Sequence, residues 1–343
     1  MLNRLVLDPS KRPIALARDL GITRSAVSQI WRQLEQVHNL SVRGMINYGE
    51  LGLIPFVGLF FTQDEPLKLR EVEDWLRQNP FVVSLAPSAV TASMESILIF
   101  ETVFPLGPKV GHFRSKLAEF QESLSGSLLF SPLIHQGQFL NLGRFNGTSW
   151  NITDFFRLEA VIHATKDYVD IIPENLLVEI SSPSPSNIEL SIVAVALEKN
   201  YFANTREVLH WFEIFDVIPP SDRTIRRRIN EVREKIVTPY VHLTGLNLAQ
   251  RVALVFKAPP SSDVVRTLIA QLNSYPRTRV AMGNTLTMVY IDLPSSIDWF
   301  AISTTVSVLD PSGSILFPFV ISEDLIRKGL EGVVQQMIHS SDK

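Results

Sequence analysis

One stretch of the chain occurs twice. Residues 40–61, LSVRGMINYGELGLIPFVGLFF, resemble residues 236–257, IVTPYVHLTGLNLAQRVALVFK. Inside them GELGL matches TGLNL, which starts 195 residues later, and VGLFF matches VALVF at the same offset of 195 residues. Two matches at one offset indicate a duplicated unit. We therefore expect two copies of one architecture, and the length of 343 residues provides room for them.

The residues after each copied stretch predict the same order of strands and helices. Apolar runs alternate with amphipathic segments, one of which ends before Pro80 and its counterpart at Pro276. In the first copy we expect a strand at 57–61, a helix at 65–80, strands at 81–89 and 92–103, a helix at 107–124 and a strand at 127–135. In the second copy we expect a strand at 251–258, a helix at 261–276, strands at 277–283 and 284–293, a helix at 295–309 and a strand at 314–322. Both orders are β-α-β-β-α-β, the ferredoxin-like order, which predicts an α+β fold.

A pair of helices precedes the first copy. Residues 13–20 predict a short helix that ends at Gly21, and Thr23 suits the N-cap of a second helix. The second helix carries an apolar stripe, made of Val27, Ile30, Trp31 and Leu34. Its other face carries groups that can donate to DNA bases and phosphates, namely Arg24, Ser25, Ser28, Gln29 and Arg32. This is the helix-turn-helix layout, although an ordinary solvated helix would show the same face.

Three helices are expected before the second copy: one at 187–200, one that is followed by a turn within 206–220, and one at 221–235. Ser221 takes the N-cap place of Thr23. The outward face of the third helix again carries donors, namely Arg223, Arg226, Arg227 and Asn230. Because similar faces occur at two equivalent places, the sequence favours a pair of DNA-reading helices.

The whole arrangement resembles the Lrp/AsnC family of transcription regulators. The most specific shared part is the linking strand VRGMINYGELGL at 42–53, and the likeness covers 13–135 well and 187–322 more loosely. The resemblance implies a winged-helix-like DNA-binding head and a ferredoxin-like (RAM-type) body through which the family dimerises. Three features differ from the family, and the first is that one chain holds two copies of a unit that the family normally has once. The first head has only MLNRLVLD at its start, so its first helix is shortened or replaced, and the Gly-Asp pair of amino-acid-sensing members is absent, which argues against an effector.

The Ser- and Pro-rich segment 181–186 marks the clearest domain boundary. We expect a first helix-turn-helix domain at 1–50, a first ferredoxin-like domain at 51–140, a connecting segment at 141–186, a second helix-turn-helix domain at 187–245 and a second ferredoxin-like domain at 246–343. A helix is expected at 152–169 and a closing helix at 323–340. The two ferredoxin-like bodies would pair within the chain as a pseudo-dimer.

Charge and composition exclude several classes of function. The net charge of −3 excludes a globally basic nucleic-acid coat, although residues 1–43 hold seven basic and three acidic residues. The lack of cysteine excludes disulfides and thiolate chemistry. No phosphate-binding glycine loop or nucleophile elbow is found, and the seven histidines lack metal-ligand spacing. We therefore expect no enzyme, with no catalytic residue, cofactor or metal.

The sequence thus predicts a sequence-specific DNA-binding transcription regulator that acts as an intrachain pseudo-dimer. Base contacts are expected from Arg24, Gln29, Arg223 and Arg227, and phosphate contacts from Arg32 and Arg226. The alternative is a protein-interaction regulator that docks on a transcription factor or polymerase. The expected partners are double-stranded DNA and, through the ferredoxin-like domains, further copies of the chain. The longest apolar run, 51–61, is too short to span a bilayer, so we expect no membrane contact and a cytoplasmic, nucleoid-associated protein.

Overall fold

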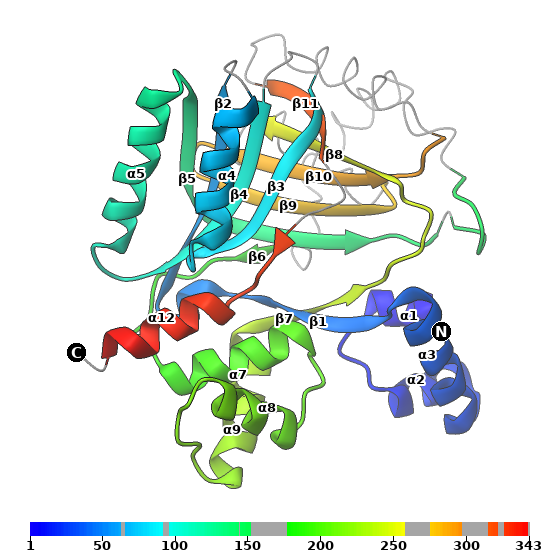
Figure 1. Cartoon of the computed structure of the whole chain (residues 1–343). Coiled ribbons are helices and arrows are strands. Elements are labelled where there is room, and N and C mark those ends of the chain that lie inside the picture. Colours follow the sequence, from blue (N-terminus) through cyan, green and yellow to red (C-terminus); the bar gives the residue numbers. More distant parts are fainter. Residues whose placement is uncertain are drawn as a thin grey trace.

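The structure is a computed structural model that describes residues 1–62, 66–91, 96–143, 145–151, 177–257, 275–296, 315–321 and 326–341. It has an α+β fold with antiparallel sheets, which confirms the predicted fold class at that level. In the view of Figure 1 a large curved sheet lies at the top, a two-stranded ribbon crosses beneath it, and two groups of helices lie at and below the ribbon.

The first group of helices lies at the N-terminus. It contains α1 (Leu2–Leu7), α2 (Pro13–Leu20) and α3 (Arg24–His38). Gly21 ends α2 with a φ of 64°, and Thr23 Oγ1 caps α3 by accepting from the Ala26 N–H at 3.2 Å. The predicted stripe of α3 is fully buried only at Val27, whereas Ile30 is exposed, because the 8-residue α2 covers only part of the 15-residue α3.

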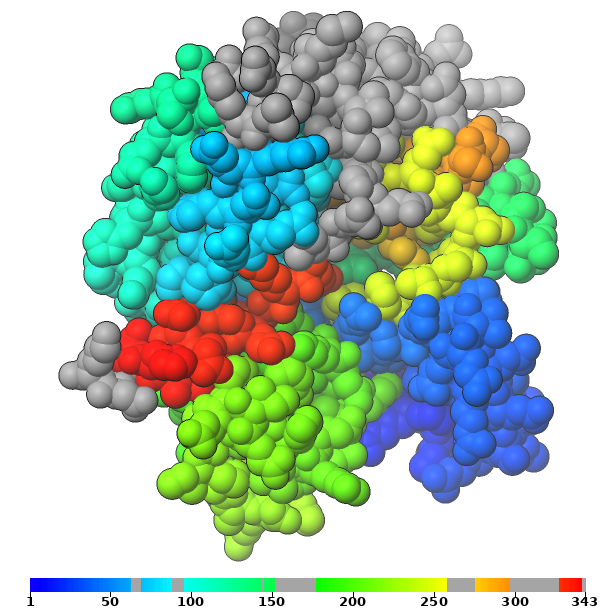
Figure 2. All heavy atoms as spheres, viewed as in Figure 1, coloured from blue at the N-terminus to red at the C-terminus, as the bar shows by residue number. Residues whose placement is uncertain are grey.

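The second group of helices follows residue 187. It contains α7 (Ile188–Lys199), α8 (Thr205–Ile214) and α9 (Asp222–Lys235), which confirms three helices there. Asn204 and Glu207 form a reciprocal capping box at the start of α8. The helix ends at Ile214 and the expected turn follows it, since Asp216 has a φ of 53° and a Pro-Pro pair comes next. The two groups lie at the lower side of the molecule in Figure 2, and they meet where the Trp31 and Phe202 ring centroids are 6.3 Å apart.

The ribbon joins the two groups of helices to each other. It pairs β1 (Ser41–Ile46) with β7 (Val237–His242), so that Arg43 lies opposite Tyr240 and Ser41 lies opposite His242. Opposite residues of an antiparallel pair share a face, so these side chains point to one side of the ribbon. The other side packs on α7 at Gly44, where a Cβ would lie 2.8 Å from Leu197 O.

The large sheet closes on itself among the strands that the structure describes. Its order is β11-β8-β10-β9-β5-β2-β4-β3, and β3 pairs back to β11. Closure leaves no open edge between these strands. The strands are β2 (Leu53–Thr62), β3 (Val82–Thr91), β4 (Ser96–Pro105), β5 (Ser127–Leu140), β8 (Gln250–Phe256), β9 (Arg277–Gly283), β10 (Thr287–Leu293) and β11 (Ile315–Ile321). Shorter elements extend the sheet and cover it, namely η1 (Tyr48–Leu51), β6 (Val178–Glu179), β12 (Ile326–Arg327), α4 (Pro66–Gln78), α5 (Lys109–Ser123) and α12 (Glu331–Ser341).

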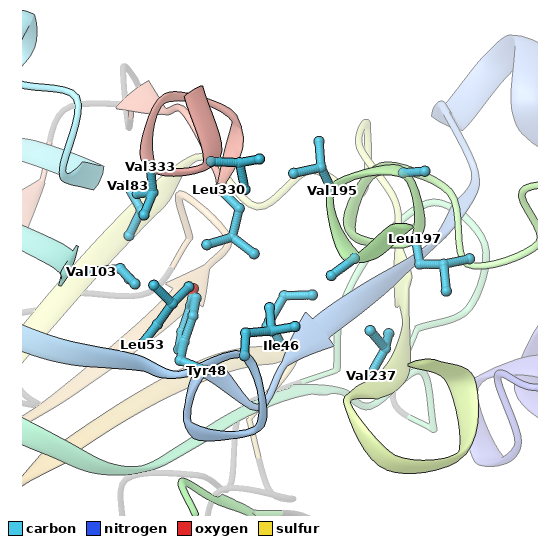
Figure 3. Close-up of a cluster of buried hydrophobic side chains, with 14 of the residues drawn as sticks. Ile46, Tyr48, Leu53, Val83, Val103, Val195, Leu197, Val237, Leu330 and Val333 are labelled. Atoms are coloured by element: carbon cyan, nitrogen blue, oxygen red, sulfur yellow. The ribbon is translucent and has the colours of Figure 1, made fainter. Parts of the chain in front are cut away.

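Two apolar cores hold these layers together. The first fills the inside of the closed sheet, with buried side chains from both halves of the chain such as Val57, Ile99 and Val255. The second lies where α12, α7 and the ribbon meet the sheet, and it contains Leu330 and Val195 (Figure 3). Each fully buried side chain of this size contributes roughly 1.5–3 kcal/mol to stability.

The expected order of elements is confirmed for the first copy, where strand, helix, two strands, helix and strand follow one another from β2 to β5. Strand β5 runs to Leu140 because it pairs with β9 beyond the predicted end at residue 135. The closing helix begins at Glu331, eight residues after its predicted start, since β12 and Gly329 with a φ of 69° precede it. The helix expected at 152–169 lies outside the described residues, as do residues 261–274 and 297–309 of the other two expected helices. The domain boundaries stay predictions. No helix in the described ranges has the length and apolar character needed to cross a bilayer.

Candidate functional site

A cavity of about 230 Å³ lies between the ribbon and the large sheet. Its walls come from β1, β7, β12 and the inner face of the sheet. The lining residues are Arg43, Gln138, His242, Arg251, Arg277, Thr278, Arg279, Tyr290, Asp292 and Arg327. Five arginines therefore face one space with a single carboxylate among them.

Strand register places three of the charged residues in one row. Arg251 and Arg277 each lie opposite Asp292, on the two strands that flank β10. Arg251 donates to both carboxylate oxygens of Asp292, at 2.6 and 2.8 Å, and Arg277 Nη1 donates to the same group at 3.2 Å. Arg277 Nη2 donates to Leu243 O. One carboxylate thus neutralises one of the two guanidinium charges. The three side chains are held rigidly, because Asp292 is only 7% exposed and binds both guanidinium groups.

Arg279 pairs with Glu101, and the other two arginines, Arg43 and Arg327, are less compensated. Arg43 Nε donates to Ser41 Oγ at 3.2 Å, and Arg327 Nη1 donates to the Tyr240 hydroxyl at 3.1 Å. Neither has a carboxylate partner among the described residues.

Arg43 and Arg327 also line a second cavity of about 270 Å³, whose lining includes Lys199 and Lys328. On the opposite side, Arg251, Arg277 and Asp292 also border a third cavity of about 460 Å³ beside the loop at 244–249. The three cavities therefore adjoin through shared residues.

His242 enters the cavity from the ribbon as a neutral imidazole. Burial lowers its pKa from 6.5 to about 3, and the nearby charges of Arg43, Arg277, Arg327 and Arg251 act in the same direction. With five arginines, one aspartate and a neutral histidine, the lining residues have a formal charge of +4, of which Glu101 compensates one through its ion pair with Arg279. Guanidinium groups match carboxylates with two parallel hydrogen bonds, so this lining suits a ligand with several carboxylates.

The predicted site residues lie elsewhere. On α3, Arg24, Ser25, Gln29 and Arg32 are exposed and Ser28 is half-buried; on α9, Arg223, Arg226, Arg227 and Asn230 are exposed. None of them lines the cavity. A helix face that contacts only water is exposed in the same way. The pattern of exposed donors therefore does not identify a DNA contact.

Sequence reasoning missed the cavity, although a signal was present. Arg277 and Arg279 alternate in a strand that is otherwise apolar, and Tyr290 and Asp292 alternate in the next. Period-two spacing puts such pairs on one face of a strand. Two arginines on a strand face that the apolar pattern predicts to be buried indicate a binding site for an anionic ligand. Within the described ranges, no group of three or more His, Asp or Glu side chains is arranged to hold a metal ion.

Comparisons with known proteins give structural neighbours and no sequence relatives. No family model matches the chain, and no curated protein matches its sequence. Two solved structures have a similar fold: the siroheme decarboxylase NirDL, with a TM-score of 0.51, and the same enzyme in co-complex with an iron-uroporphyrin III analogue, with a TM-score of 0.50. Each is 11% identical in sequence and covers 96% of this chain, which in turn covers 94% and 93% of those chains. At this identity the likeness establishes the fold.

These neighbours overturn the predicted function. The solved structures that match nearly the whole chain are enzymes, not DNA-binding regulators, so the predictions of a transcription regulator and of a non-enzyme are wrong. The docking alternative gains no support from them either. The error has a physical cause: helix pairs before a ferredoxin-like body suggest a DNA-reading head, whereas the concentrated charge lies in the concave cavity.

Proposed function

We propose that this chain is an enzyme that binds an iron tetrapyrrole with several carboxylate side chains and removes CO2 from an acetate side chain. The observation that carries the proposal is the cavity in which five arginines face one aspartate. A tetrapyrrole with acetate and propionate side chains is a broad polyanion, and the second cavity extends the cationic lining with Lys199 and Lys328 beside one carboxylate, Glu198. The named activity of the structurally similar NirDL supports this choice of ligand.

The reaction needs a binding site and a proton donor but no added oxidant. When the bond between the side-chain CH2 and the carboxylate breaks, its electron pair moves into the conjugated ring system and CO2 leaves. A proton then converts the CH2 carbon to a methyl group. We assign the proton to His242, because carboxylates bound beside it would oppose the arginines that keep it neutral and would raise its pKa. The iron belongs to the substrate.

The proposal includes the tandem architecture. In each half the four strands of the body take the order fourth, first, third, second: β5-β2-β4-β3 in one half and β11-β8-β10-β9 in the other. The halves join through β5 with β9 and through β3 with β11, so second and fourth strands pair twice. Two such pairings, together with the repeat at an offset of 195 residues, support a pseudo-two-fold duplication of a helix-turn-helix unit and a ferredoxin-like body. Association between copies of the chain stays a prediction.

A titration with iron-uroporphyrin III tests the binding step. We expect the absorption spectrum of the ligand to change on binding, with an affinity that falls about tenfold or more in Arg43→Gln, because one charge-assisted contact is lost. Arg227→Gln is the matched control, since it makes the same change on the exposed face of α9. Equal affinities in these two variants, or no binding by the parent chain, would contradict the proposal.

Mass spectrometry of the bound tetrapyrrole tests the chemical step. The parent chain should yield products that are lighter by the mass of CO2. His242→Gln should keep the affinity within a few-fold and lose the product, because an amide cannot supply the proton. Unchanged product formation in this variant would remove His242 from the assigned role.

A further inference from the structure

A buried ion pair at the cavity joins the two halves of the chain. Glu101 lies on β4 and Arg279 on β9, and Arg279 Nη2 donates to Glu101 Oε2. Their side chains are only 6% and 17% exposed. The Tyr290 ring lies beside the guanidinium, with 5.8 Å from Arg279 Cζ to the ring centroid. The pair therefore holds Arg279 in one orientation at the cavity wall.

Each partner of this pair keeps one polar atom without a hydrogen bond. Arg279 Nη1 and Glu101 Oε1 are buried and have no partner among the described residues, and Thr278 Oγ1, on the same strand, is also unpaired. A buried unpaired polar group of this kind costs about 1–3 kcal/mol, more for a charged one, so such groups are rare in native proteins. The other arginines in the row differ, because Arg251 and Arg277 already bind Asp292. An unpaired donor on a fixed arginine needs a partner, and at this cavity wall a ligand carboxylate would provide one.

We propose that Arg279 receives the carboxylate of an acetate side chain and thereby makes the site prefer tetrapyrroles that carry acetate over those that carry methyl at the same position. This inference rests on the proposed function and names the residue that sets its specificity. Arg43 and Arg327 lie at the junction with the second cavity and bind carboxylates of either ligand. Glu101 is a positioning residue, since it fixes the guanidinium from the other half of the chain.

The test compares the affinities of iron-uroporphyrin III and iron-coproporphyrin III, in which methyl groups replace the acetates. The parent chain should bind the first more tightly. In Arg279→Gln this preference should fall about tenfold or more, because a charge-assisted hydrogen bond is lost for one ligand only. In Arg43→Gln both affinities should fall together and the preference should stay.

Glu101→Gln separates ligand binding from the structural role of the ion pair. It breaks the same pair as Arg279→Gln but leaves the guanidinium in place with no competing carboxylate. The preference for iron-uroporphyrin III should therefore persist or increase. Arg279→Lys keeps the charge but not the planar guanidinium, so it should lose part of the preference for iron-uroporphyrin III. It replaces Arg279→Gln in the comparison if Arg279→Gln does not fold.

Two outcomes would overturn the inference. An equal loss of preference in Glu101→Gln and Arg279→Gln would show that the ion pair acts only structurally. An unchanged preference in both Arg279 variants would show that another group recognises the acetate. Failure of the parent chain to bind either ligand is a different result, because it contradicts the proposed function itself.

Discussion

At the scale of single residues, the arginines around His242 make its protonation unfavourable. Its pKa in the folded chain is about 3, against 6.5 for an ordinary histidine. Between these pH values the unfolded chain binds a proton at this residue and the folded chain does not. The free energy of unfolding therefore decreases as the pH falls from about 6.5 toward 3.

The variant His242→Asn tests this linkage. It removes the titrating group, so its stability should fall less than that of the parent between pH 6.5 and pH 4. Urea unfolding at a series of pH values measures the difference, and His210→Asn on exposed α8 is the matched control. Parallel stability curves for the parent and His242→Asn would contradict the lowered pKa.

At the scale of elements, the contact between the ribbon and α7 depends on one glycine. A Cβ on Gly44 would lie 2.2 Å from Val237 Cγ1 and 2.8 Å from Leu197 O, so either the ribbon or the helix must move. We expect Gly44→Ala to destabilise the fold by about 1–3 kcal/mol. Gly111→Ala on α5 is the control: nothing lies within 4 Å of that Cβ, and the helix should gain about 0.5–1 kcal/mol. Urea midpoints check both values, and a neutral Gly44→Ala would contradict the close approach.

Local signals were sufficient to predict most elements and insufficient to predict how they meet. Gly21 and Thr23 bound α2 and α3 through backbone preferences that act within a few residues. The pairing of β3 with β11 joins residues more than 200 positions apart, and no local preference encodes it. The cavity has the same origin, because Arg43 and Arg251 meet only after the ribbon and the closed sheet have formed. A reading of the sequence alone therefore finds faces of helices more easily than sites between distant strands.

At the scale of the whole molecule, only one half of the chain builds the row of charges within the described residues. Arg251 and Arg277 flank Asp292, whereas in the first half the uncharged residues Val57 and Ser84 flank Glu101 on the inner face of the sheet. His242 likewise corresponds to Asn47, whose Oδ1 accepts from Ser181 N at 3.1 Å.

This asymmetry predicts one tetrapyrrole per chain. Native mass spectrometry of the chain with excess iron-uroporphyrin III should show a single bound ligand. Arg43→Gln should lower the occupancy of that site without exposing another. Two ligands per chain would contradict the asymmetry.

The pairing of β1 with β7 has a consequence for how the site is specified. Side chains alternate between the two faces of a strand, so a slip of the pairing by one residue would turn Arg43 or His242 from the cavity toward α7. The alignment of these two segments, about 195 residues apart, therefore determines which side chains of the ribbon face the cavity. Insertions or deletions of one residue in either linking strand should therefore be far more harmful than substitutions at the same positions.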